Sequence, residues 1–510
     1  ATTTTPTPKT TFNFLITDSK PSEAFLPTSI AEQKPLPPLY TTLLLLLSCN
    51  EGFVLGIMST IRIQAIQRGH SMVEYAMYVA ALPYLCSFAV SGIVDSRFVE
   101  RWGKRKAYIV ASRVLSSVLL LMLGVVGDSA VSTGKYFPLI FGIFLLNLCT
   151  AWENCALAAL RFEVFGHSHS SLSAFTHLAG ICIGYLFTGE IAYLLSNGQW
   201  CKEYGIREDG QGIIGWMGVL IVVVAVNVGV TVGTMMIKEE KEFSAETIAL
   251  QQLLPHMNAS RERSVSVEIE SLSRTLEFEY ILTPKKLLRI LFTDPIYKKI
   301  TLWLMLSSAG VIALRTTVHS QLVHRGMSYE HLSMINCVAY LVNIPANYYF
   351  MKYIVPGQIL RVSSLLLMIY LGILYIELLT VQNFSSNHNY KGTVFTYLIS
   401  IVLESLCPWI SFQFGFVNST TYPKFAAVYN STFFSILSFS KISSILVVRA
   451  LSSFVNYPLL FVILNFGNLI FICFSYNTMA LKSDLTTLEE LHKPFREDED
   501  SYYRGDGKPR

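Results

Sequence analysis

The sequence is poor in charged residues and in cysteine, and both shortages narrow the class of protein. Lys, Arg, Asp and Glu make up 15% of the 510 residues, whereas a typical soluble domain has about 25%. Hydrophobic residues make up 52%, and the mean hydropathy is +0.45. These values exclude a soluble enzyme, a disordered protein and a nucleic-acid binder. Nine cysteines are too sparse, and odd in number, for a secreted disulfide scaffold, and no pair suits a disulfide.

The two ends of the sequence lack long apolar runs. Residues 1–38 are rich in Thr, Pro and Ser and contain no apolar core of the kind that a cleavable signal peptide needs. We therefore expect a disordered cytosolic tail there. Residues 483–510 are charged and polar, and they predict a second cytosolic tail.

Between these tails, long apolar runs dominate the chain. A membrane-spanning helix needs about 20 predominantly apolar residues. The runs predict twelve such helices, at residues 40–66, 74–94, 107–127, 136–160, 172–196, 212–237, 299–321, 332–354, 359–381, 392–416, 432–452 and 457–480.

The only long polar segment inside this region separates the sixth predicted helix from the seventh. The sequence thus predicts an all-α membrane protein with twelve transmembrane helices in two six-helix bundles. The N-terminal bundle covers residues 39–237, a charged cytosolic linker covers 238–298, and the C-terminal bundle covers 299–482.

The distribution of basic residues predicts the orientation, because cytosolic loops of membrane proteins are enriched in Lys and Arg. With both tails and the linker in the cytosol, 28 basic residues lie on the cytosolic side and six on the other. We therefore expect both termini to be cytosolic.

The loop after the second predicted helix carries a distinctive pattern of acidic, basic and glycine residues. It reads Gly92-Ile-Val-Asp-Ser-Arg-Phe-Val-Glu-Arg-Trp-Gly-Lys-Arg-Lys106. This resembles the signature loop of the major facilitator superfamily, with three additional residues before the Gly–basic part. Asp95, near a helix end, is expected to pair with a cation and to accept backbone N–H bonds from a neighbouring helix. We expect the loop to act as a conformational switch, with these residues: Asp95, Arg97, Gly103, Lys104 and Arg105.

Several ionisable residues lie inside predicted helices, where a charge is costly and therefore marks a candidate site. Glu51, Glu153, Arg315 and Glu404 fall on the first, fourth, seventh and tenth helices. In the nested repeats of this superfamily, these helices line the central cavity. Arg62 follows Glu51 on the same helical face. We expect these five residues to line a substrate or ion path; the alternative is that they form buried pairs that only stabilise the helices.

Four segments resemble the acetyl-coenzyme A transporter family, a branch of this superfamily. The most specific is the stretch from Val94 to Lys106, where the family reads much like V-D-A-x-Y-V-x-x-x-G-R-R-K with the same spacing. The other three segments are Leu43–Ile61 with Gly52 and Gly56, Gly180–Tyr204 with Gly184-Tyr185 and Trp200-Cys201, and Leu322–Leu332 with Gly326 and Glu330-His331.

Two positions depart from the family pattern. The family has Gln where this chain has Glu51, and its fourth helix reads Q-D-x-A-V-D where this chain has Glu153-Asn-Cys-Ala-Leu-Ala158. Both aspartates are therefore missing. The roles of these family residues do not transfer, which leaves the coupling ion and the substrate open.

The resemblance implies a transporter in the endoplasmic reticulum membrane that imports acetyl-CoA from the cytosol by alternating access, with proton coupling left open. The alternatives are another transporter of the same fold, for a peptide, a sugar derivative or a drug-like solute, and a multispan acyltransferase built on a buried histidine such as His177. The expected partners are acetyl-CoA or another polar small molecule and the lipid bilayer. The sequence predicts no enzyme activity, cofactor, metal or nucleic-acid partner, and it leaves the oligomeric state open.

Overall fold

The computed structural model describes most of the N-terminal bundle and parts of the C-terminal bundle. The described residues are 38–67, 79–96, 105–165, 170–209, 211–236, 325–353, 359–384, 390–405 and 426–452, with a few short pieces elsewhere. Predicted helices 299–321 and 457–480 lie largely outside these residues, as does the linker 238–298.

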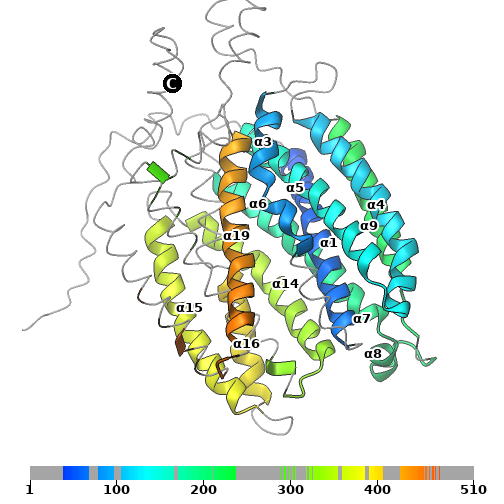
Figure 1. Cartoon of the computed structure of the whole chain (residues 1–510), viewed down its shortest axis with the longest axis vertical. Coiled ribbons are helices and arrows are strands. Elements are labelled where there is room, and N and C mark those ends of the chain that lie inside the picture. The colour runs from blue at the N-terminus through cyan, green and yellow to red at the C-terminus, as the bar shows by residue number, and fades with distance from the viewer. Residues whose placement is uncertain are drawn as a thin grey trace, which may run out of the picture.

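The described part of the N-terminal bundle is helical throughout (Figure 1). Its elements, in chain order, are α1 (Pro38–Gln67), η3 (Leu82–Tyr84), α3 (Ser87–Ser96), α4 (Lys106–Thr133), α5 (Phe137–Phe165), α6 (Ser170–Tyr185), the π-helical η4 (Leu186–Ile191), α7 (Ala192–Ser196), α8 (Gly198–Glu203) and α9 (Trp216–Met236). Asn197 begins α8 by accepting the backbone N–H groups of Gln199 and Trp200.

Four helices of the C-terminal bundle are described: α14 (Tyr329–Tyr353), α15 (Ile359–Gln382), α16 (Tyr390–Ser405) and α19 (Ala426–Ser452). Among the described residues, six helices are long and apolar enough to cross a membrane. Large apolar side chains point outward from them; Val125 on α4 is 72% exposed and Met236 on α9 is 79% exposed. An apolar outer surface of this kind is suited to lipid rather than water.

Among the described helices, α1 packs most extensively on the α6–η4 stretch, and this packing depends on glycine. A Cβ atom added to Gly52 would lie 2.2 Å from the carbonyl oxygen of Ile181, and one added to Gly184 would lie 2.2 Å from that of Cys49. Gly56 is equally close to Thr188 and Gly189. Gly52, Gly56 and Gly184 therefore permit the close approach of these helices.

We expect Gly184→Ala to destabilise the protein by about 1–3 kcal/mol, because two helix backbones must move apart to admit one methyl group. Thermal unfolding in detergent measures the loss. Gly229→Ala on α9 is the matched control, since its added Cβ meets nothing within 4 Å. Equal melting temperatures for the two variants would contradict the prediction.

Among the described residues, the two bundles contact each other at two places. α19 packs on α3 and α5, and α14 packs on α6 with η4 (Figure 1). At the first place, hydroxyl groups join α3 and α19: Ser87 Oγ lies 2.9 Å from Ser435 Oγ. At the second place, ring contacts join α6 and α14, with the ring centroids of Tyr185 and Tyr340 5.2 Å apart. A movement of one bundle against the other must therefore change the contacts at both of these places.

Candidate functional site

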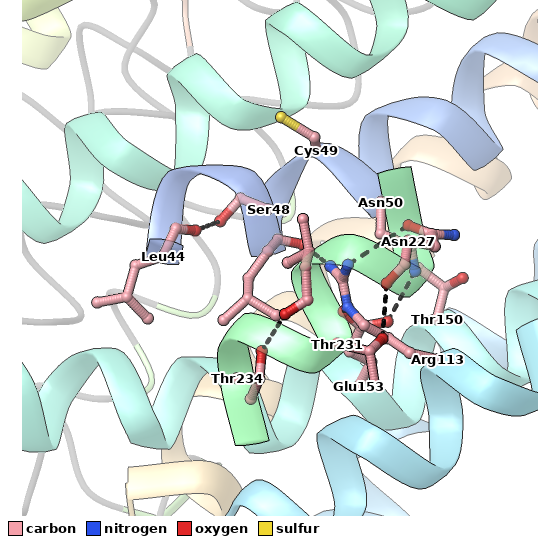
Figure 2. A network of polar contacts seen from close by, with 12 residues as sticks. Leu44, Ser48, Cys49, Asn50, Arg113, Thr150, Glu153, Asn227, Thr231 and Thr234 are labelled. Carbon is pink, nitrogen blue, oxygen red and sulfur yellow. Dashed lines mark hydrogen bonds and ion pairs between the residues drawn. The ribbon is translucent and has the colours of Figure 1, made fainter. Parts of the chain in front are cut away.

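Two groups of buried polar residues lie side by side in the N-terminal bundle, and the first is fully paired. Arg113 on α4 donates from Nε to Glu153 Oε1 on α5 at 2.7 Å. Its Nη2 donates to the Leu47 carbonyl at 2.5 Å, and its Nη1 lies 3.4 Å from Asn227 Oδ1 on α9. Asn50 on α1 donates to Glu153 Oε2 at 2.7 Å and accepts from Asn227 Nδ2 at 2.9 Å. Figure 2 shows this closed network.

This network joins four helices of one bundle and excludes water. Glu153 is 1% exposed and Arg113 is 0% exposed. Both oxygens of Glu153 are occupied by Arg113 and Asn50. The structure thus gives Glu153, which the sequence assigned to a substrate path, the contacts of a buried stabilising pair. Arg113 is the cation of this pair.

The second group surrounds Glu51 and is incompletely paired. Glu51 Oε2 lies 3.5 Å from His177 Nε2 on α6, and His177 Nδ1 lies 3.3 Å from Ser48 Oγ. Among the described residues, three polar atoms here have no hydrogen-bond partner: Glu51 Oε2, Asn154 Nδ2 and Arg161 Nη1. Asn154 lies close to the Glu51 carboxyl, but its Nδ2 does not meet hydrogen-bond geometry.

These unpaired atoms are deeply buried: Glu51 is 4% exposed and Arg161 is 5% exposed. A buried polar group without a partner costs about 1–3 kcal/mol, and a charged one costs more. Unpaired polar atoms in native proteins are rare and call for an explanation. Asn154 and Arg161 both interact with Glu51, so the three atoms belong to one group, which makes it a candidate place for water, an ion or a solute to complete the bonding.

The other predicted path residues are located only in part. Arg62 lies on α1 beyond Glu51 and is half-buried. Arg315 lies outside the described residues. Glu404 lies on α16, and its side chain is outside the described set. The structure thus places Glu51 and Glu153 in neighbouring groups of one bundle, and a path lined by all five residues stays a prediction.

The sequence missed Arg161. The fourth predicted helix ends at residue 160, which predicts that Arg161 lies in a cytosolic loop. α5 in fact continues to Phe165, and Arg161 lies inside the bundle. The sequence signal that could have found it is Phe162, Val164 and Phe165, which continue the apolar run after Arg161.

Asp95 makes both kinds of contact that were expected from its position at a helix end. Its carboxylate pairs with Arg105 Nη2 at 2.8 Å. It also accepts the backbone N–H groups of Val428 at 2.8 Å and Ala427 at 3.3 Å. These belong to the first turn of α19, whose N–H groups have no partner within the helix. The interaction thus joins α3 to the opposite bundle.

Arg105 is the centre of this contact, which we call the Asp95 latch (Asp95, Arg105, Glu163 and the start of α19). Arg105 also donates from Nε to Glu163 Oε1 at 2.8 Å. Burial alone would lower the pKa of Arg105, but Asp95 and Glu163 outweigh it and raise the pKa above its ordinary value. The guanidinium therefore stays charged in this buried position. Arg97, Gly103 and Lys104 of the predicted switch lie outside the described residues.

A second set of contacts joins the bundles at the other end of the molecule, which we call the Glu330 latch (Tyr193, Asn197 and Glu330). Glu330, in the first turn of α14, accepts from Asn197 Nδ2 at 2.7 Å and from the Tyr193 hydroxyl at 3.2 Å. Nearby, Asn336 Nδ2 donates to Glu190 Oε1 at 3.0 Å. In Figure 1, α7 and α8 lie at the bottom and α3 lies at the top.

We expect Glu330→Ala to loosen this end, because it removes two hydrogen bonds between the bundles, each worth about 1 kcal/mol or more. The native thiol of Cys337 on α14 is the probe: its alkylation by a bulky maleimide in detergent should speed up about fivefold or more. Glu203→Ala on exposed α8 is the control, with an unchanged rate. A rate in Glu330→Ala equal to that of the wild type would refute the latch.

The model of the acetyl-coenzyme A transporter 1 family matches residues 40–457, which is more than half of the chain. The chain belongs to this family. This confirms the resemblance carried by the Asp95 loop and the other three segments. Because the family consists of transporters, it also confirms that the chain is a transporter rather than an enzyme, and the acyltransferase alternative is set aside.

Two curated proteins are similar to part of this chain. "Putative transporter AmpG 4" of Rickettsia conorii (strain ATCC VR-613 / Malish 7) is 28% identical over 159 residues, which are 29% of this chain and 37% of the relative. The protein of the same name from Rickettsia felis (strain ATCC VR-1525 / URRWXCal2) is 26% identical over the same shares. The chain spans 37% of the length of these curated relatives.

Solved structures show the fold. The human organic anion transporter MFSD10 (TETRAN) has a TM-score of 0.56 at 10% identity, over 86% of this chain and 100% of that chain. The proton:xylose symporter XylE, bound to 6-bromo-6-deoxy-D-glucose, has a TM-score of 0.56 at 11% identity, over 89% of this chain and 98% of that chain. The predicted all-α major facilitator fold of a multi-pass membrane protein is therefore confirmed.

Proposed function

We propose that this protein transports acetyl-CoA from the cytosol to the lumen of the endoplasmic reticulum by alternating access. The family membership supports a small-molecule substrate. The observation that carries the proposal is the incompletely paired group around Glu51 and Arg161, because it offers a buried site with a cation for an anionic solute. In this proposal both termini are cytosolic, and the Asp95 latch faces the cytosol.

The chemistry of acetyl-CoA fits a site of this kind. The molecule carries several phosphate charges, and an arginine side chain binds phosphate through its planar fork of N–H donors. Arg161 presents such a fork inside the bundle, and Lys441 on α19 adds positive potential from the opposite bundle. A site shared between the bundles is one that either side can reach in turn as the bundles rock.

The two latches supply the alternation in this proposal. The Asp95 latch holds α3 to α19 at one end, and the Glu330 latch holds α7 to α14 at the other. Opening one latch while the other stays closed would expose the central site to one side only. Proton coupling is part of the proposal through the Glu51–His177 contact, which brings two groups able to carry a proton to 3.5 Å.

Uptake into proteoliposomes tests the substrate. Purified protein is reconstituted, and entry of radiolabelled acetyl-CoA is compared with empty vesicles and with labelled xylose, with and without an inward proton gradient. We expect uptake of acetyl-CoA alone, accelerated by the gradient. No uptake of acetyl-CoA above empty vesicles would defeat the substrate assignment. Uptake of xylose would favour the alternative of a sugar derivative.

A further inference from the structure

We infer that Arg161 anchors an anionic group of the transported solute, a phosphate or a carboxylate, and that this group takes the place of Glu51 as the counter-charge of Arg161. The inference rests on the proposed function, because it concerns the site that the solute enters. Arg161 is thus a solute-binding residue, and the replacement of Glu51 by the anion links solute binding to proton movement.

Two buried arginines of this bundle, Arg113 and Arg161, differ sharply in the number of hydrogen bonds that they make. Arg113 has a carboxylate, a backbone carbonyl and an amide oxygen as acceptors. Among the described residues, Arg161 makes no ion pair, and its one hydrogen bond runs from Nε to the Leu157 carbonyl on its own helix at 3.4 Å. Its Nη1 has no partner. The guanidinium of Arg161, which is 5% exposed, therefore has N–H donors without an acceptor.

A buried arginine with unpaired N–H groups needs a hydrogen-bond acceptor. Burying an uncompensated charge is strongly unfavourable, and an acceptor with two oxygens in one plane satisfies the fork. Phosphate and carboxylate have this geometry. A neutral sugar hydroxyl supplies a weaker acceptor and no charge. The unmet bonding of Arg161 therefore selects for an anion.

In the absence of the anion, Glu51 is the group that compensates the positive charge of Arg161. The cations that face Glu51 are Arg161 on α5 and Lys441 on α19. The other ionisable groups facing Glu51 are Glu153 on α5, His177 on α6 and Tyr84 in η3. Glu51 is within electrostatic reach of Arg161, yet no hydrogen bond locks the two together. Because no hydrogen bond joins them, a solute anion can replace Glu51 as the counter-charge of Arg161.

The exchange moves one proton. When a solute anion bonds to Arg161, the carboxylate of Glu51 loses its main source of positive potential while remaining buried. It then binds a proton from water on the open side and becomes a neutral carboxylic acid; no other bond is made or broken. When the anion leaves on the other side, Glu51 releases the proton there. One solute anion and one proton thus cross together.

Binding to purified protein in detergent tests the anchor. Labelled acetyl-CoA is the first probe, and inorganic pyrophosphate, a bare anion, competes as the second. Arg161→Gln should weaken binding of both probes at least about tenfold, because it removes a charge-assisted bond. Arg161→Lys should restore part of the affinity. Arg207→Gln in an exposed loop is the control, with unchanged affinity. Melting temperatures confirm that the variants fold.

Proton uptake tests the exchange in the same samples. In weak buffer with a pH indicator, acetyl-CoA binding to the wild type should take up about one proton, and affinity should fall as pH rises. Glu51→Gln should take up none and bind with little pH dependence. Equal affinity of Arg161→Gln and wild type, or undiminished proton uptake by Glu51→Gln, overturns the inference.

The substrate assignment fails separately. If the wild type binds pyrophosphate through Arg161 but does not bind acetyl-CoA, the anion anchor stands and the proposed substrate is wrong. If the wild type binds neither probe, both proposals are wrong.

Discussion

Replacing Arg113 by alanine is expected to destabilise the protein by about 3–5 kcal/mol, the largest stability loss that we predict for one side chain. Removing one member of a buried ion pair leaves the other charge without compensation. Here Glu153 would remain 1% exposed with only Asn50 as donor, and the Leu47 carbonyl and Asn227 would lose their donor as well. Chemical denaturation in mixed detergent micelles measures the loss.

The exposed pair Arg207–Asp209 provides the matched control for this experiment. Its side chains are 42% and 46% exposed, although its N–O distance of 2.8 Å is close to the 2.7 Å of the buried pair. Arg207→Ala should therefore cost less than about 1 kcal/mol. The comparison isolates burial as the cause, since the pair geometry is nearly the same.

A double replacement separates a stabilising role of Glu153 from a role in transport. Arg113→Met combined with Glu153→Met removes both charges and should recover most of the stability lost in Arg113→Ala. If the double variant is stable and still transports, the pair is structural. If it is stable but transports nothing, Glu153 belongs to the solute path, as its position on the fourth helix suggested.

The bounds of several described helices were predictable from the sequence. The predicted helix 74–94 was wrong in its described part, where η3 and two turns precede α3. The predicted helix 40–66 is α1 (Pro38–Gln67), and the predicted helix 359–381 is α15 (Ile359–Gln382). The reason is physical: in lipid every backbone group must be bonded within the helix, so the apolar run and the helix have nearly the same bounds. Arg161 is the exception. The predicted apolar run stops before this charged residue, whereas the helix continues past it because Arg161 is buried inside the bundle.

The pairing of side chains was predictable only where it is local. Asp95 and Arg105 lie in one loop, and the sequence identified both. The partners of Glu153 come from α1 and α4, and the capped helix α19 lies far along the chain from Asp95. A single sequence gives the cost of each buried charge but not the helix that compensates it. It therefore could not tell that Glu153 is fully paired and Glu51 is not.

Asp95→Ala is expected to reduce transport about tenfold or more, the largest functional effect outside the central site. The alanine keeps neither the ion pair with Arg105 nor the two acceptors for the first turn of α19. Bonds to charged groups are worth about 1.5–3 kcal/mol each, and a loss of 1.4 kcal/mol shifts a two-state equilibrium tenfold. The conformation closed at the Asp95 end should lose most of its population, and the transport cycle should stall.

Two measurements on Asp95→Ala test this, with Asp209→Ala in the exposed pair as control. The first is the rate of acetyl-CoA uptake in proteoliposomes. The second is alkylation of the native thiol of Cys155, which is 2% exposed and donates to the Ser87 carbonyl between α5 and α3. We expect Cys155 to react faster in Asp95→Ala, because α19 no longer holds α3 in place. Slow transport with unchanged Cys155 reactivity would mean that Asp95 acts on transport without closing this end.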